Sequence, residues 1–169
     1  MTKKLPSEEQ GLLAVPYKAP PIKGTLADGS AYRAAADKRS WIVLYFYPKD
    51  MTSGCTAEAV AFQAALPSFK RLGARIIGVS RDSSARHTQF MDKEGLTFDL
   101  IADEGAELCA AYDVWKEKKL YGRTYMGILR STFVIDPKGR VVAAWRGVKV
   151  PGHVDAVLAT LRHLKSSAD

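Results

Sequence analysis

The run WIVLYFY, residues 41–47, indicates the fold class of this chain. It is apolar on both faces and rich in aromatic and β-branched residues, which is typical of a strand buried on both sides of a sheet. Pro48 ends this strand, because proline lacks the N–H that a central strand needs. Apolar residues then recur at helical spacing from Gly54 until Gly73, and a second buried strand follows at 74–80 (ARIIGVS). This strand, helix, strand order predicts a parallel pair of strands.

The same alternation continues along the chain. Ser83 has the character of a helix cap and Gly95 that of a helix end, so a helix is expected between them. A further strand is predicted at 97–102 and a further helix at 105–113. Pro67 lies inside the first helix and is expected to kink or restart it.

The C-terminal third adds antiparallel pairing. Residues 131–136 (STFVID) and 141–145 (VVAAW) read as strands joined by a Pro-Lys-Gly-Arg turn, and a last helix is expected from about Gly152. A turn at 27–30 (ADGS) predicts a small N-terminal hairpin. Together these elements predict an α/β, thioredoxin-like fold, with a central mixed sheet flanked by helices and an N-terminal hairpin extension.

The composition is that of an ordinary globular domain, with 169 residues, 47% apolar and 25% charged. We expect residues 1–15 to be an extension and 16–169 a single domain. The longest apolar run is seven residues, whereas a helix needs about 20 to cross a bilayer. The start, MTKKLPSEEQ, lacks the apolar stretch of a signal peptide, so a cytoplasmic protein without a membrane partner is expected.

The net charge of +7 is concentrated in residues 115–130. Aromatic residues interleave with the cations there, a combination that nucleic-acid interfaces also use. A solvated basic loop is the interpretation we prefer, because charge alone specifies no partner, and no nucleic-acid partner is expected. The charged residues of the segment are Lys116, Lys118, Lys119, Arg123 and Arg130, against Glu117.

Two cysteines, Cys55 and Cys109, are too few for a disulfide scaffold, and no CxxC or Cys/His cluster suggests zinc. Cys55 falls in the first turn of the expected helix, where the partial positive charge favours a thiolate. A lone cysteine is more often a small buried hydrophobe. Here its neighbours favour reactivity: Thr52 can direct a hydroxyl at the sulfur, Pro48 limits water, and Gly54 lets backbone approach closely.

The spacing Pro48-x-x-x-Thr52-x-x-Cys55 resembles the active-site signature of peroxiredoxins. The stretch YFYPKDMTSGCTAEA, at 45–59, is particularly similar to the bacterioferritin comigratory protein (peroxiredoxin Q) subfamily. The similarity continues through RLGARIIGVSRDS, FDLIADE and VWKEKKLYGRTYMGILRSTFVIDPKGRV. It covers nearly the whole chain beyond residue 15.

This resemblance implies a thiol peroxidase acting on hydrogen peroxide and organic hydroperoxides. Cys55 would attack the peroxide as a thiolate and become a sulfenic acid. Arg130, just before the STFVID strand, would keep the sulfur ionised, and Thr52 would hold the peroxide oxygens. Pro48 and the backbone N–H of Cys55 would shape the pocket, and no metal or organic cofactor is implied.

Three further residues are expected around the substrate pocket: Gly54, Tyr47 and Glu58. Glu58 matches a glutamate of the family. An exposed first-turn carboxylate that serves the helix dipole is an equally good interpretation of it.

The chain departs from its relatives in the resolving cysteine. Val60 and Met91 occupy the two usual positions, and Cys109 lies in a helical context that suggests packing. We therefore expect a one-cysteine mechanism, in which thioredoxin, glutaredoxin or glutathione reduces Cys55. A monomer or weak dimer is expected.

Other functions remain as alternatives. His87, His153 or His163 could serve Cys55 as the base of a cysteine hydrolase, but none lies in a motif that links it to the sulfur, and packing or surface roles are preferred. A protein disulfide reductase is disfavoured by the missing CxxC. A redox-sensing or chaperone-like binding protein without turnover is the main rival interpretation.

Overall fold

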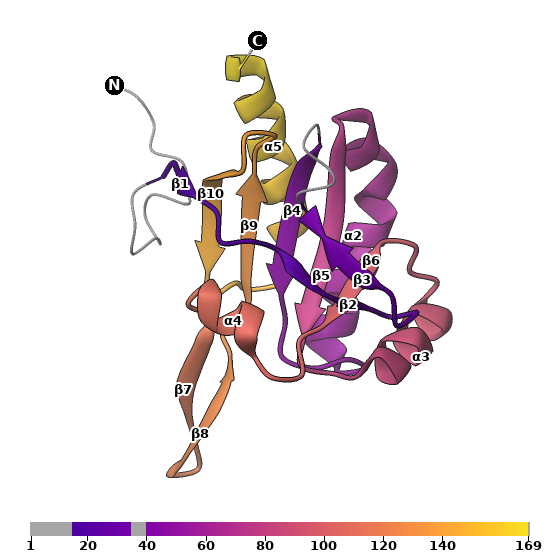
Figure 1. Ribbon diagram of the computed structural model, residues 1–169, viewed down its shortest axis with the longest axis vertical. Coiled ribbons are helices and arrows are strands. Elements are labelled where there is room, and N and C mark those ends of the chain that lie inside the picture. The colour runs from indigo at the N-terminus through magenta and orange to yellow at the C-terminus, as the bar shows by residue number, and fades with distance from the viewer. Residues whose placement is uncertain (1–14, 35–39, 169) are drawn as a thin grey trace.

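The computed structural model describes residues 15–34 and 40–168, and its main sheet has eight strands in the order β1-β10-β9-β4-β5-β6-β2-β3 (Figure 1). A separate two-stranded sheet pairs β7 with β8. The strand bounds are β1 Tyr17–Lys18, β2 Lys23–Leu26, β3 Ala31–Arg33, β4 Trp41–Phe46, β5 Ala74–Ser80, β6 Asp99–Ala102, β7 Trp115–Leu120, β8 Arg123–Ile128, β9 Ser131–Ile135 and β10 Arg140–Arg146.

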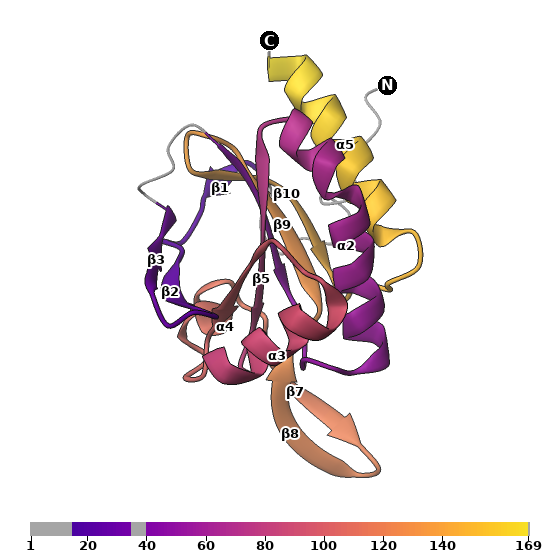
Figure 2. The same cartoon turned by 90° about the vertical axis from the view of Figure 1, so that its right-hand side faces the viewer.

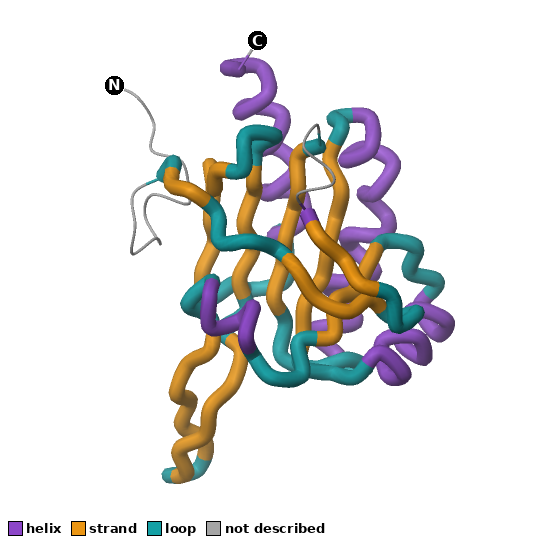
Figure 3. The backbone as a smooth tube through the Cα atoms, in the orientation of Figure 1, coloured by secondary structure: helices purple, strands orange, loops and turns teal. Residues whose placement is uncertain are grey.

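The helices cover both faces of the main sheet (Figure 2). They are α2 Ser53–Arg71, α3 Ser84–Glu94, α4 Glu107–Ala111 and α5 His153–Ala168. Helices α2 and α5 pack side by side on one face, and α4 lies on the other. The tube in Figure 3 shows how loops join these helices to the strands. None of the helices in the described part is both long and apolar enough to cross a membrane.

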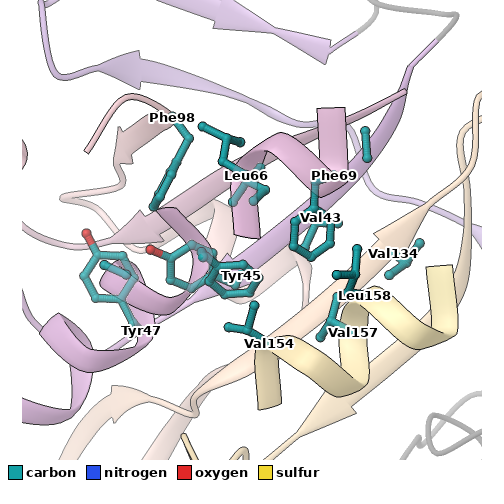
Figure 4. Packing of buried hydrophobic residues seen from close by; sticks show 14 of the residues in the cluster. Val43, Tyr45, Tyr47, Leu66, Phe69, Phe98, Val134, Val154, Val157 and Leu158 are labelled. Carbon is teal, nitrogen blue, oxygen red and sulfur yellow. The ribbon is translucent and has the colours of Figure 1, made fainter. Parts of the chain in front are cut away.

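Strand β4 forms the centre of the fold because its alternate residues enter two different cores. Val43, Tyr45 and the following Tyr47 join the core beneath α2 and α5, which Figure 4 shows from close by. Leu44 and Phe46 join the second core, against α4 and the N-terminal strands. The strand pairs in parallel with β5 and antiparallel with β9, so the expected mixed, thioredoxin-like sheet is confirmed.

Several boundaries agree with the sequence pattern. The side chain of Ser83 accepts a hydrogen bond from the Arg86 N–H, and Gly95 closes α3 with a left-handed φ of 65°. Strands β2 and β3 form the expected N-terminal hairpin, and β9 pairs antiparallel with β10. The expected extension at 1–15 falls almost wholly outside the described residues.

Other predictions about the elements were wrong at least in part. The restart expected at Pro67 does not occur: helix α2 continues through this residue, and its buried side chains, Phe62 and Phe69 among them, pack against the sheet. Such packing offsets the roughly 3 kcal/mol that an interior proline costs. The expected helix at 105–113 shortens to α4. The basic segment, interpreted as a solvated loop, instead forms the hairpin β7–β8.

Candidate active site

The sheet topology brings Cys55 next to Arg130 although 75 positions separate them. Strand β4 leads into the loop 47–52 and then into α2, which places Cys55 at the third position of the helix. Strand β9 runs antiparallel beside β4, with Ser131 opposite Phe46. The residue just before β9 therefore lies where the loop after β4 begins.

The sulfur, the guanidinium and a carboxylate form one hydrogen-bonded row. Arg130 donates from Nη2 to the Cys55 Sγ at 3.3 Å and from Nη1 to the Glu58 Oε1 at 2.7 Å. Cys55 is only 2% exposed and Glu58 is fully buried, whereas the Arg130 side chain keeps 16% of its surface exposed. A Cβ added at Gly54 would lie 3.4 Å from Nη2 of Arg130, so the lack of a side chain there suits the close packing of the guanidinium.

The first turn of α2 also has backbone N–H groups without partners inside the helix. Its first backbone hydrogen bond joins the Thr56 N–H to the Thr52 carbonyl at 2.9 Å. The N–H groups of Ser53, Gly54 and Cys55 precede that bond, and such free donors carry the positive end of the helix dipole. Both the helix and Arg130 thus place positive charge beside the Cys55 sulfur.

The buried charges shift one another's protonation. Burial raises the pKa of Glu58 to about 7, and the neighbouring Arg130 limits that rise. Burial also lowers the pKa of Arg130, but Glu58 and Cys55 outweigh this effect and raise it above the ordinary arginine value. The second carboxylate oxygen of Glu58, Oε2, has no hydrogen-bond partner. The interpretation of Glu58 as an exposed first-turn carboxylate is therefore wrong, because its side chain turns inward to Arg130.

The other predicted residues lie in the loop before the helix. Thr52 is the exposed N-cap residue of α2, but its side chain makes no cap hydrogen bond. Its hydroxyl instead donates to the Lys49 carbonyl at 2.8 Å, which leaves the oxygen free to accept hydrogen bonds. Pro48 is exposed at the start of the loop.

A buried polar network anchors this loop, and the sequence pattern gave no sign of it. Tyr47 donates to Asp50 Oδ1 at 2.5 Å, and the other carboxylate oxygen lies 2.6 Å from His87 Nδ1. His87 also contacts the Ile101 carbonyl through Nε2 at 2.9 Å, while the Asp50 N–H donates to Asp82 at 2.8 Å. The Tyr47 hydroxyl, expected at the substrate pocket, is thus occupied by Asp50.

This network leads to a stability prediction. The Asp50 and His87 side chains are both fully buried, so His87→Leu leaves a buried carboxylate with one partner fewer. We expect it to lower the free energy of unfolding by about 3 kcal/mol, measured by urea denaturation. His163→Leu, at an exposed position, is the matched control. Equal losses in the two variants would contradict the anchoring role.

His153 lies near the site without touching the sulfur. Its Nε2 is 2.8 Å from the Thr132 hydroxyl, and its ring packs edge-on against Trp145. Burial, followed by the nearby Arg130 charge, lowers the pKa of His153 to about 4. A hydrogen-bonded core role therefore describes His153 better than that of a base for Cys55.

Glu58 and His153 should give opposite pH dependences of stability. Between pH 4.5 and 7, folded Glu58 binds a proton that the unfolded chain releases, so its contribution falls as pH rises. Between pH 4 and 6.5, unfolded His153 binds a proton that the folded chain excludes, so its contribution rises with pH. Each effect amounts to about 3 kcal/mol, and in the unaltered protein they largely cancel.

Single substitutions separate the two contributions. The stability of Glu58→Gln minus that of the unaltered protein should rise by about 3 kcal/mol from pH 4.5 to 7. For His153→Gln the same difference should fall by about as much from pH 4 to 6.5. Urea denaturation across this range measures both. Glu104→Gln and His163→Gln, at exposed positions, are the controls. If the stability differences of Glu58→Gln and His153→Gln changed with pH no more than those of the controls, the assignment of these pH effects to Glu58 and His153 would be refuted.

The second cysteine lies on the other side of the sheet. Cys55 belongs to the core beneath α2 and α5, whereas Cys109, in α4, belongs to the opposite core. Burial raises the pKa of the Cys109 thiol well above its ordinary value, and its backbone N–H donates to Asp103 at 2.8 Å. Both cysteines are free. Within the described ranges, no group of three or more His, Cys, Asp or Glu side chains could hold a metal ion.

Comparison with known proteins shows which family this chain matches. The AhpC/TSA family matches residues 15–144. A peroxiredoxin Bcp of Xanthomonas campestris is 51% identical over 138 residues, 82% of this chain and 86% of that protein. A peroxiredoxin Bcp of Bacillus subtilis is 47% identical over 152 residues, 90% of this chain and 97% of that protein. The solved structure of the Xanthomonas campestris bacterioferritin comigratory protein, described in terms of its alkyl peroxide reduction activity, is 49% identical. It superimposes with a TM-score of 0.80 over 84% of this chain and 90% of that one.

Proposed function

The chain belongs to the AhpC/TSA family and is a thiol peroxidase of the peroxiredoxin type, and from this premise we propose that Cys55 is its peroxidatic cysteine. The observation that carries the assignment is the 3.3 Å hydrogen bond from Arg130 to the Cys55 sulfur at the start of α2. Cys109 offers no comparable setting, because it is buried among apolar residues on the opposite side of the sheet.

The proposed reaction begins with the Cys55 thiolate attacking one oxygen of a hydroperoxide. A sulfur–oxygen bond forms as the oxygen–oxygen bond breaks, which gives Cys55 sulfenic acid and water or an alcohol. The sulfur is oxidised, the peroxide is reduced, and the leaving oxygen takes up a proton. Arg130 stabilises the negative charge on the thiolate and then on the departing oxygen. Alkyl peroxides join hydrogen peroxide in the proposed substrate range, since a relative is described by that activity.

The loop residues complete the proposed pocket. The Thr52 oxygen can accept a hydrogen bond from the peroxide, because its own proton is engaged by Lys49. The free N–H of Cys55 can donate to the peroxide oxygens. Pro48, at the start of the loop, would restrict water at the pocket wall, and Gly54 leaves room for the Arg130 guanidinium.

We further propose a one-cysteine cycle. An external thiol attacks the sulfenic sulfur, and a second thiol then releases Cys55 as a thiolate. The separation of the two cysteines by the sheet supports this, because a disulfide needs Cα atoms within about 7 Å. Thioredoxin, glutaredoxin and glutathione are the candidate donors. A reducing compartment such as the cytoplasm would supply them.

Mass spectrometry combined with steady-state kinetics tests the proposal. Protein treated with one equivalent of hydrogen peroxide, without reductant, should carry a single added oxygen on Cys55 and no disulfide. Added thiol should then restore the original mass and sustain peroxide consumption. A Cys55–Cys109 disulfide would contradict the one-cysteine cycle, while a reaction no faster than that of free cysteine would favour a binding or sensing role.

A further inference from the structure

The hairpin β7–β8 stands apart from the rest of the fold. Its two strands pair with each other and with no other strand in the described part of the chain. Figures 1 and 2 both show it extending from one end of the molecule, beyond the sheet and helices. Only its base is packed, because Ile128 is buried in the second core and Trp115 packs against that core. A two-stranded hairpin with so little packing is only marginally stable in water, so its length beyond the base points to a role in contacts.

The hairpin also exposes apolar side chains. Tyr121 at the turn is 97% exposed, and Leu120, Tyr125 and Met126 are between 47% and 56% exposed. These are four of the five large hydrophobic residues exposed in the described ranges, and the fifth is Val60. An open hollow of about 640 Å³ at the turn is lined by Leu120, Tyr121, Arg123, Thr124 and Tyr125. Clustered apolar exposure of this kind marks contact sites more often than it marks plain surface.

Cations lie alongside these apolar groups. The strands carry Lys118, Lys119 and Arg123 in addition to Lys116, which pairs with Asp113 at 2.5 Å. Glu117 is the one acidic residue of the hairpin. A partner that matches this surface therefore presents carboxylates around an apolar centre.

The base of the hairpin adjoins the candidate active site. Arg130, which contacts the Cys55 sulfur, lies two residues after the end of β8. Lys118 lies near enough to Arg130 and Cys55 for the charges of both to affect its pKa. Burial lowers its pKa first, the Arg130 charge lowers it further, and the Cys55 charge raises it. The exposed surface of the hairpin thus extends outward from the point where a reductant must deliver its thiol.

We propose that the hairpin β7–β8 is the docking surface for a protein thiol donor whose reactive cysteine is surrounded by apolar and acidic residues. This inference rests on the proposed function and names the class of reductant. The donor's thiolate attacks the sulfenic sulfur of Cys55, so a disulfide forms between the proteins and water leaves. A second donor thiol then attacks the donor's own sulfur, which completes the donor's disulfide and releases Cys55 as a thiolate.

The geometry favours a protein over a small thiol or a membrane. A small thiol such as glutathione needs no exposed apolar surface of this extent. A membrane that received the tip at Tyr121 would remain away from Cys55 by the length of the hairpin, about 20 Å for six residues of strand. A protein seated along the side of the hairpin can instead contact the tip and place its cysteine at the base.

Steady-state kinetics with two reductants tests the inference. The probe donor is an acidic dithiol protein of the thioredoxin type, regenerated by its NADPH-dependent reductase, and dithiothreitol is the small reductant. Leu120→Ser/Tyr121→Ser and Lys119→Glu/Arg123→Glu should each lower kcat/KM for the protein donor about tenfold or more. Peroxide consumption with dithiothreitol should change less than about twofold, because none of these residues belongs to the candidate active site.

A matched charge control comes from the far end of the sheet. Lys18→Glu/Lys138→Glu changes the net charge as much as Lys119→Glu/Arg123→Glu does, at exposed positions near the β9–β10 turn. It should leave kcat/KM for the protein donor within about twofold, whereas added salt should lower that value for the unaltered chain. Equal losses in this control and in the hairpin variants would overturn the inference.

The remaining outcomes separate this inference from the proposed function. Absence of turnover with dithiothreitol in the unaltered chain would overturn the proposed function and the docking surface with it. Turnover with dithiothreitol but none with the protein donor would overturn the docking surface alone. Sedimentation with phosphatidylglycerol vesicles, lost in the hairpin variants while protein-donor kinetics stay normal, would assign the hairpin to membranes and overturn the inference as well.

Discussion

Replacing Cys55 with serine is expected to lower the rate constant for hydrogen peroxide by roughly three orders of magnitude or more. A serine hydroxyl stays protonated near neutral pH, even beside the Arg130 guanidinium and the first turn of α2. It therefore offers no anionic nucleophile for the peroxide oxygen. Stopped-flow measurement of peroxide consumption over the first turnover gives this rate directly, without any contribution from the reductant.

Cys109→Ser is the control for this experiment, since it removes the chain's other thiol. The rate constant should stay within about twofold of the original, because Cys109 lies in the opposite core and does not contact the candidate active site. Full activity in Cys55→Ser combined with loss in Cys109→Ser would reverse the assignment of the two cysteines.

Replacing Arg130 with glutamine should lower the same rate constant roughly a hundredfold or more. The change removes the positively charged guanidinium that lies beside the Cys55 sulfur. It also removes the hydrogen-bond donor proposed to face the oxygen–oxygen bond as it breaks. It also removes the partner of Glu58, whose Oε1 accepts from Arg130 at 2.7 Å. Lost stability and lost chemistry would then be mixed, so a second variant is needed.

The double variant Arg130→Gln/Glu58→Gln separates the two effects. Neither residue then carries a charge, so no unpaired carboxylate is buried and stability should recover relative to Arg130→Gln. The rate constant should remain low, because the guanidinium is still missing. Urea denaturation reports the first quantity and stopped-flow kinetics the second. Recovery of the rate in the double variant would show that Arg130 acts only through folding.

Local patterns predicted the central elements well. The run 41–47 is buried on both faces because it alternates between two cores, and continuous hydrophobicity of this kind indicates a central strand. The position of Cys55 at the start of a helix also followed from the sequence, since Pro48 ends one element and apolar spacing begins the next. The pairing with Arg130 required the family resemblance, because periodicity does not show which strands are neighbours.

Features that depend on tertiary contacts were not predictable in this way. Glu58 turns inward because Arg130 arrives from a strand far along the chain, and an isolated helix would expose that carboxylate. The contact between Asp50 and His87 likewise joins a loop to α3 across 37 positions. The hairpin β7–β8 was missed for a different reason, since most of its residues are exposed on both strands and only Ile128 is buried, so no alternation of buried and exposed positions marks them as strands.

The order of the strands also has a consequence for how the protein is made. Cys55 emerges from the ribosome well before Arg130, which follows it by 75 positions. Strand β9 must then pair with β4 before the guanidinium can reach the sulfur. Until then the emerging polypeptide carries a thiol without its cationic neighbour. The Cys55 sulfur therefore gains its guanidinium neighbour only after translation has passed residue 130 of 169.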